Sequence, residues 1–112
     1  MEEDIQSIEP QALEARLAQN DPELVVIDVR EDDEVATGMI PGAKHIRLGD
    51  LPERYEELDP EKTYVMVCRS GRRSLLASQF MAEKGFKVIN MEGGMIKWTG
   101  EIRAKADSQS DF

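Results

Sequence analysis

Residues 63–74 read TYVMVCRSGRRS, and the fold can be worked out from this stretch. The first five residues are mainly apolar, which is typical of a strand that is covered on both faces of a sheet. From Arg72 onward apolar residues recur at helical spacing up to Gly85, which predicts a helix that ends there. A buried strand that passes through a short link into a helix is the repeating unit of a parallel α/β sheet.

Segments on both sides of this stretch fit the same pattern. The sequences LVVIDV at 24–29 and KVINM at 87–91 are also largely apolar and predict two more buried strands. The sequence PQALEARLAQ at 10–19 has leucines four residues apart after a proline, which predicts a short amphipathic helix. Because short links join the strands to helices, we expect parallel strands with helices on both faces of the sheet.

The length and charge of the chain limit its organisation and its partners. The 112 residues suit one domain, which we expect to span 1–104, followed by a frayed tail at 105–112. Lys and Arg number 14 against 23 Asp and Glu, and the net charge of −9 argues against general binding to nucleic acid or to an anionic membrane. The acidic stretch EDDE at 31–34 is most simply a solvated face. The start, MEEDIQ, has no leader pattern and no apolar run has membrane length, so we expect a cytoplasmic protein that does not enter a membrane.

Cys68, the only cysteine, begins the link between the expected strand and helix. Ligands bind at this end of parallel strands, and a link that curls into a helix points its N–H groups inward, as Gly71 permits. These N–H groups, the helix dipole and the loop arginines are expected to lower the pKa of Cys68 below its usual value of about 8.5. One cysteine forms no internal disulfide, and together with the single His45 it does not make a metal site. A buried, inert cysteine is the alternative, but exposed arginines favour a nucleophile beside an anion site; they are Arg69, Arg72 and Arg73.

Other residues are predicted to support this site rather than to react. Asp28 and Arg30 lie two residues apart at the end of a strand, so their side chains share one face and could pair or brace the loop. Gly93 and Gly94 are expected to end a strand and to let the backbone pass close to the cysteine loop. Ser74, in the first turn of the expected helix, is predicted to support the loop as well.

Four segments, in this order, resemble the single-domain rhodanese (thiosulfate sulfurtransferase-like) family. They are DVRE at 28–31, GMIPGA at 38–43, the Cys68 loop, and NMEGGMIKW at 90–98, and they span most of the chain. Met39 departs from the family, which most often has histidine at this position. The resemblance implies a rhodanese-like α/β fold, with a central, mostly parallel five-stranded sheet flanked by helices on both faces. It also implies sulfur transfer through a cysteine persulfide. We expect no cofactor.

In the mechanism that this resemblance implies, the Cys68 thiolate attacks the outer sulfur of an anionic donor such as thiosulfate, and sulfite leaves. Since the chain has no second cysteine, the sulfur must then pass to an external acceptor, such as cyanide, a small thiol or a protein thiol. The residues expected to bind the donor and the persulfide are Arg69, Ser70, Gly71, Arg72, Arg73 and Arg30.

Two other functions remain open at this point. A cysteine-dependent phosphatase or arsenate reductase would use a similar loop, but cysteine phosphatases place an arginine after five intervening residues to clamp two phosphoryl oxygens. Here Ser74 holds that position and Arg73 lies one residue too early, which favours sulfur over phosphate chemistry. A non-catalytic module that only docks partners is the second alternative, and the presence of the cysteine in its loop argues against it.

Overall fold

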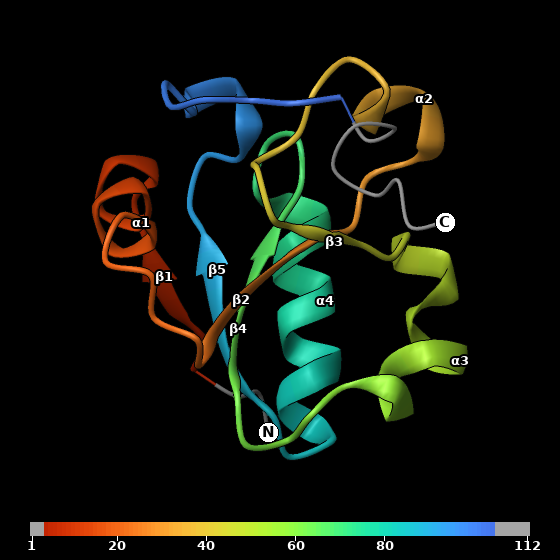
Figure 1. Cartoon of the computed structure of the whole chain (residues 1–112). Coiled ribbons are helices and arrows are strands. Elements are labelled where there is room, and N and C mark those ends of the chain that lie inside the picture. Colours follow the sequence, from red (N-terminus) through yellow and green to blue (C-terminus); the bar gives the residue numbers. More distant parts are fainter. Residues whose placement is uncertain (1–3, 105–112) are drawn as a thin grey trace, which may run out of the picture.

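The computed structural model describes residues 4–104, which form a five-stranded sheet with helices packed on it (Figure 1). The strand order is β1-β5-β4-β2-β3, and every neighbouring pair is parallel. The α/β class and the parallel five-stranded sheet are therefore confirmed. The strands are β1 (Gln6–Ile8), β2 (Leu24–Asp28), β3 (Lys44–His45), β4 (Thr63–Val67) and β5 (Lys87–Met91).

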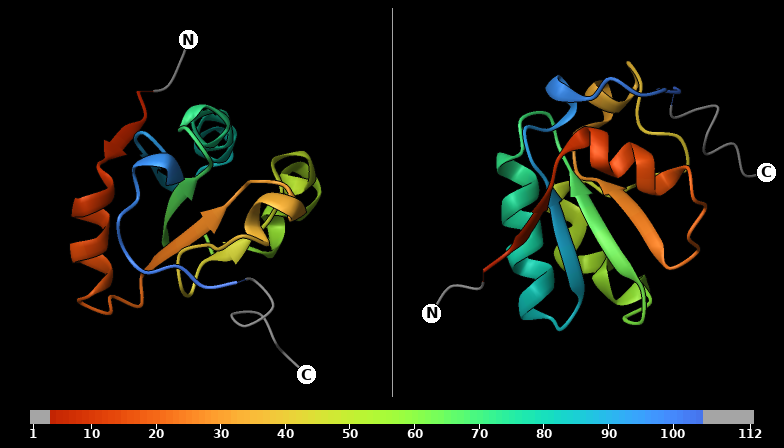
Figure 2. Two further views of the ribbon diagram at one scale, coloured as in Figure 1. Left: turned by 90° about the horizontal axis from the view of Figure 1, so that it is seen from above. Right: turned by 90° about the vertical axis from the view of Figure 1, so that its left-hand side faces the viewer.

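Helices cover both faces of the sheet, with α1 on one side and α3 and α4 on the other (Figure 2). Successive residues of a strand face opposite layers, so Val65 and Val67 pack into the core with α1, whereas Tyr64 and Met66 pack into the core with α4. Cys68 continues this alternation and also lies in the α4 core. The α-helices are α1 (Pro10–Leu17), α2 (Asp32–Val35), α3 (Leu51–Arg54) and α4 (Arg72–Glu83), and the 3-10 helices are η1 (Leu48–Asp50), η2 (Tyr55–Glu57) and η3 (Met95–Lys97).

The elements predicted from the sequence are found close to their expected limits. α1 corresponds to the expected amphipathic helix, and β2, β4 and β5 correspond to the three expected strands. α4 ends at Glu83, two residues before Gly85. The sequence does not predict β1, because QSI at 6–8 is short and has a single strongly apolar residue. This strand forms at the sheet edge, where it pairs in parallel with β5.

The buried face of α4 differs from the one that its large apolar residues suggest. Leu75 and Leu76 are exposed to solvent although they follow helical spacing. Most residues that face the sheet are small, which lets the helix approach β4 and β5 closely. The buried residues of α4 are Ser74, Ala77, Ser78 and Met81.

Two further expectations are a frayed C-terminal tail and the absence of a membrane-spanning segment. The expected frayed tail at 105–112 lies outside the described residues. Within residues 4–104, every helix is too short or too polar to cross a bilayer.

Candidate active site

The Cys68 loop, residues 68–71, lies at the carboxyl edge of the sheet, between the end of β4 and the start of α4 (Figure 1). Gly71 immediately precedes the helix with a φ of 98°, a left-handed conformation that residues with a Cβ rarely adopt. This turn directs the N–H of Gly71 toward the cysteine, and its nitrogen lies 3.0 Å from Cys68 Sγ. The left-handed turn at Gly71 thus provides one of the hydrogen-bond donors to the sulfur.

The environment of Cys68 favours the thiolate. Burial, with 0% of the residue exposed, raises the pKa of the thiol. Hydrogen bonds from the Ser74 hydroxyl and from the backbone N–H groups of Ser74, Gly71 and Ser70 outweigh burial and lower the pKa below its ordinary value. The main groups that lower the pKa are therefore donors of the loop and of the first helical turn rather than guanidinium groups. A lower pKa increases the fraction of the nucleophilic form at neutral pH.

Asn90, in β5, holds Ser74 and Gly71 together. Its Oδ1 accepts a hydrogen bond from Ser74 Oγ at 2.5 Å, and its Nδ2 donates to the carbonyl oxygen of Gly71 at 3.2 Å. The Ser74 hydroxyl has a single proton, so it donates either to Asn90 or to Cys68 Sγ, and formation of the thiolate favours the second. Asn90 is not among the site residues predicted from the sequence, although a polar side chain within the apolar strand KVINM is a signal of such a role.

Residues 94–96, which follow β5, pack against the Cys68 loop. The N–H groups of Met95 and Ile96 donate to the carbonyl oxygens of Cys68 and Arg69, at 2.8 and 3.0 Å. Gly94 makes this approach possible, because a Cβ at that position would collide with the backbone of Arg69. The loop is therefore fixed by backbone contacts from a distant part of the chain.

Arg30 is buried and bound to Asp28. Its Nε donates to Asp28 Oδ1 at 2.9 Å, and its Nη2 donates to Asp28 Oδ2 and to the carbonyl oxygen of Gly38, both at 2.8 Å. Only 6% of Arg30 is exposed. The pairing of Asp28 with Arg30 that the spacing suggests is present, and a donor anion would have to compete with Asp28 to reach Arg30. His45, at the β3 edge, contacts the carbonyl oxygen of Arg30 through Nε2 at 2.7 Å.

Arg73 is also paired with a carboxylate. Its Nη1 and Nη2 donate to the two carboxylate oxygens of Glu34, each at 2.8 Å. The hydrogen bond from Arg73 lowers the pKa of Glu34 to about 2, against an opposing effect of burial. Reading EDDE as a solvated face is therefore wrong for Glu34, because α2 carries this side chain to the start of α4. Arg69 and Arg72 are exposed, and neither forms an ion pair with any residue of the described range 4–104.

We expect Glu34→Gln to remove a pH-dependent contribution to stability. The pKa of Glu34 is about 2 in the folded protein against an ordinary value of 4.5. The ion pair therefore stabilises the fold fully above pH 4.5, and this stabilisation is lost as the pH falls toward 2. Urea unfolding at several pH values should show a steeper loss of stability in the wild type than in the variant across this range.

Asp33→Asn is the matched control, since Asp33 lies beside Glu34 in α2 and is exposed. Its pH dependence should follow that of the wild type. Equal slopes for Glu34→Gln and the wild type would show that the ion pair does not form in solution.

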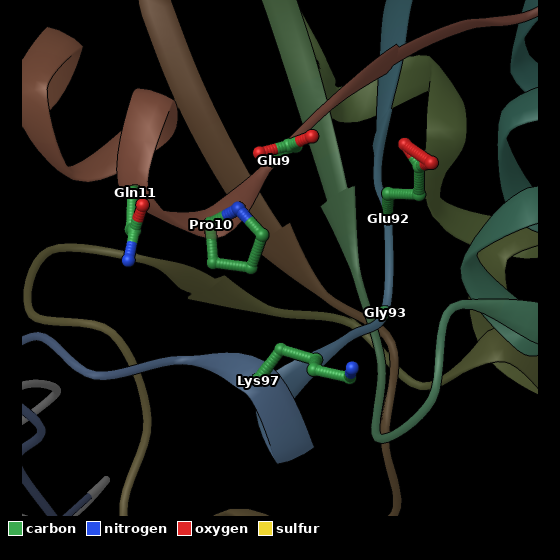
Figure 3. Close-up of a pocket in the computed structure, with 6 residues that line it drawn as sticks. All are labelled: Glu9, Pro10, Gln11, Glu92, Gly93 and Lys97. Carbon is green, nitrogen blue, oxygen red and sulfur yellow. The ribbon is translucent and has the colours of Figure 1, made fainter.

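A hollow of about 370 Å³ lies beside the segment that supports the loop, next to the start of α1 (Figure 3). Gly93 borders this hollow and also lies against the loop, since a Cβ on Gly71 would be 3.1 Å from Gly93 N. Cys68 is not among the residues that line this hollow. Within 4–104, no group of three His, Cys, Asp or Glu side chains is arranged to hold a metal ion. The residues around the hollow are Glu9, Pro10, Gln11, Glu92, Gly93 and Lys97.

The chain is similar to a known protein family and to named proteins of other organisms. The family described as "Rhodanese-like domain" matches residues 9–101. The Bacillus subtilis protein named "Putative sulfurtransferase YtwF" is 52% identical over 102 residues, which cover 91% of this chain and 98% of that protein. The family match at 9–101 includes the Cys68 loop and strands β2 to β5.

Solved structures of the same architecture carry different descriptions. A rhodanese-like domain protein from Staphylococcus aureus is 32% identical, with a TM-score of 0.84, and the match covers 90% of this chain and 99% of that one. A Rhodopseudomonas palustris protein described as a "Possible Tyrosine Phosphatase" is 27% identical, with a TM-score of 0.78, over 84% of this chain and 79% of that one. On the family match and the identity to its relatives, the chain belongs to the rhodanese-like domain family.

Proposed function

We propose that the protein is a sulfurtransferase that carries a sulfur atom on Cys68 as a persulfide. The observation that carries this proposal is the convergence of hydrogen-bond donors on Cys68, which lowers the pKa of the thiol. A thiolate is the nucleophile that sulfur transfer requires. The name of the Bacillus subtilis relative supports the same activity.

In the first half reaction, the thiolate attacks the outer sulfur of an anionic donor such as thiosulfate. A new S–S bond forms on Cys68, the S–S bond of the donor breaks, and sulfite leaves with the bonding electron pair. Arg69 and Arg72 attract the donor, since Arg30 and Arg73 already bind carboxylates. Cys68 has no exposed surface, so the residues that cover its sulfur must shift to admit the donor.

The persulfide then carries its negative charge on the outer sulfur. Backbone N–H groups of the loop and of the first turn of α4 stabilise this charge, as they stabilise the thiolate. In the second half reaction an acceptor thiolate or cyanide attacks the outer sulfur, and Cys68 leaves as a thiolate. The acceptor is external, because the chain has a single cysteine. We place this activity in the cytoplasm.

Intact-mass spectrometry tests the proposal. After incubation with thiosulfate and removal of excess donor, the mass should increase by one sulfur atom, and dithiothreitol should remove it. The same preparation should not hydrolyse an aryl phosphate, because Ser74 stands where a phosphatase needs its arginine and is bound to Asn90 instead. Phosphate release that depends on Cys68, without a sulfur adduct, would assign the site to phosphoryl transfer.

We expect Ser74→Ala to raise the pKa of Cys68 and to slow persulfide formation near neutral pH. The hydroxyl of Ser74 contributes the largest of the effects that lower the thiol pKa, and alanine cannot donate this hydrogen bond. The rate of alkylation by iodoacetamide, measured against pH, should shift its midpoint upward.

Ser78→Ala is the matched control for this variant. Ser78 is buried in the same helix, and its hydroxyl donates to the carbonyl oxygen of Ser74 at 2.8 Å rather than to the sulfur. Its alkylation profile should coincide with that of the wild type. A Ser74→Ala profile with the same midpoint would mean that this hydroxyl stays with Asn90 when the thiolate forms.

A further inference from the structure

Large apolar side chains are exposed around the cysteine loop. The described residues contain four large hydrophobic side chains that are exposed, and all four belong to segments at the carboxyl edge of the sheet. Contiguous exposed apolar surface marks interaction sites more often than isolated side chains do. The four are Leu75 at 38%, Leu76 at 54%, Ile96 at 60% and Ile102 at 50%.

Three of these side chains belong to residues that neighbour Arg69 in the loop or Arg72 at the start of α4, the two arginines near the site that form no ion pair within residues 4–104. Leu75 and Leu76 follow Arg72 by three and four residues in α4, so they are its neighbours on the helix surface. Ile96 lies beside Arg69, because its N–H donates to the carbonyl oxygen of Arg69 at 3.0 Å. We call these five residues the loop rim.

The charge of the loop rim is opposite to that of the chain. The other two arginines near the site are neutralised, Arg30 by Asp28 and Arg73 by Glu34. Arg69 and Arg72 therefore keep their positive charge toward solvent, in a chain whose net charge is −9. A molecule that covers the loop rim must offer negative charge to the arginines and apolar surface to the leucines and Ile96.

We propose that the loop rim docks an acceptor protein whose cysteine stands among acidic and apolar side chains; this inference rests on the proposed sulfurtransferase function. A small thiol or cyanide has too little apolar surface to cover Leu75, Leu76 and Ile96 together. In the transfer step the acceptor thiolate attacks the outer sulfur of the persulfide. The S–S bond to Cys68 breaks, Cys68 leaves as a thiolate, and the acceptor becomes a persulfide, so no oxidant or reductant is consumed.

A single-turnover assay tests the loop rim with defined probes. The protein is loaded with thiosulfate, freed of donor, and mixed with a short peptide whose cysteine is flanked by glutamate and leucine. Two further peptides replace either the glutamates with lysines or the leucines with serines, and 2-mercaptoethanol serves as an uncharged reference thiol. Rate constants are compared per thiolate, because flanking charges change the pKa of the peptide cysteine. The acidic, apolar peptide should react about tenfold faster than either variant peptide, and high salt should reduce its advantage over the lysine peptide.

Two variants of Leu76, Leu76→Ser and Leu76→Met, distinguish docking of the peptide from the sulfur-transfer step itself. The ratio of the rate constant for the acidic, apolar peptide to that for 2-mercaptoethanol should fall several-fold in Leu76→Ser and stay close to the wild-type ratio in Leu76→Met.

Equal rates for all three peptides in the wild type, or an unchanged ratio in Leu76→Ser, would overturn the inference. An unchanged ratio together with a dimer that Leu76→Ser dissociates would instead assign the rim to a second copy of the chain. Failure to load any sulfur would overturn the proposed function and the docking with it, which the mass spectrum shows before a peptide is added.

Discussion

The Cys68→Ser variant is expected to lose sulfur transfer while keeping its fold. Serine is nearly the same size as cysteine, but its hydroxyl is not ionised at neutral pH and is a poor nucleophile without a base. Removal of the nucleophile costs on the order of 10⁶ in rate in a serine protease, so transfer from thiosulfate to cyanide should fall to background. The formation of thiocyanate measures the rate, and intact mass should show no sulfur adduct.

Circular dichroism and thermal unfolding provide the control for this variant. The Gly71 N–H that donates to Sγ at 3.0 Å can also donate to a hydroxyl oxygen, so the loop should keep its conformation. A folded Cys68→Ser protein that still transfers sulfur would contradict the persulfide mechanism. A variant that does not fold would be replaced by Cys68→Ala, which has no polar atom to bury.

The Gly94→Ala variant is expected to lose most of its activity and a large part of its stability. Gly94 has φ 67° and ψ −166°, a backbone conformation that costs other residues about 1 to 3 kcal/mol. Its Cβ would also collide with the backbone of Arg69 and Ser70, which cannot rotate away as a side chain can. Either the loop or η3 must move, so the hydrogen bond from Met95 N–H to the carbonyl oxygen of Cys68 is lost. Thermal unfolding and the rate of persulfide formation measure the two effects.

Gly49→Ala is the matched control for Gly94→Ala. A Cβ on Gly49 would have no neighbouring heavy atom within 4 Å, and Gly49 does not have a positive φ. This variant should unfold near the wild-type temperature and form the persulfide at the wild-type rate. If Gly94→Ala behaved like Gly49→Ala, the close contact between the segment after β5 and the loop would not be required for the site.

The central part of the fold could be predicted because its signals are local. β2, β4 and β5 are apolar segments with short links, and each can be recognised without knowing its neighbours. The edge strand β1 forms because β5 offers it a pairing surface, and the three residues of QSI do not predict that contact. The buried face of α4 could not be predicted either, because it includes the polar residues Ser74 and Ser78. Their hydroxyls bond to Asn90 and to the helix backbone.

The sequence predicted the Cys68 loop, the Asp28–Arg30 pair and the close approach of Gly93 and Gly94 to the loop, but not the polar contacts between distant side chains. Cys68, Gly71 and the arginines lie within a few residues of each other, and their chemistry follows from that spacing. The Glu34–Arg73 pair joins residues 39 positions apart, and the Ser74–Asn90 contact joins residues 16 apart. Sequence spacing shows how many cations a loop has, but only the folded chain shows which of them are already neutralised.

The pairing of β1 with β5 also constrains how the molecule is made. Gln6 lies opposite Ile89, so the sheet cannot be completed until β5 has left the ribosome. Until then β1 has no partner, and contacts so distant along the chain form slowly. Both outer strands are short, with three residues in β1 and two in β3, and they offer little edge to a neighbouring nascent chain. Once β5 and β1 have paired, the finished sheet therefore ends in two short strands, whereas the five residues of β4 form its edge until β5 arrives.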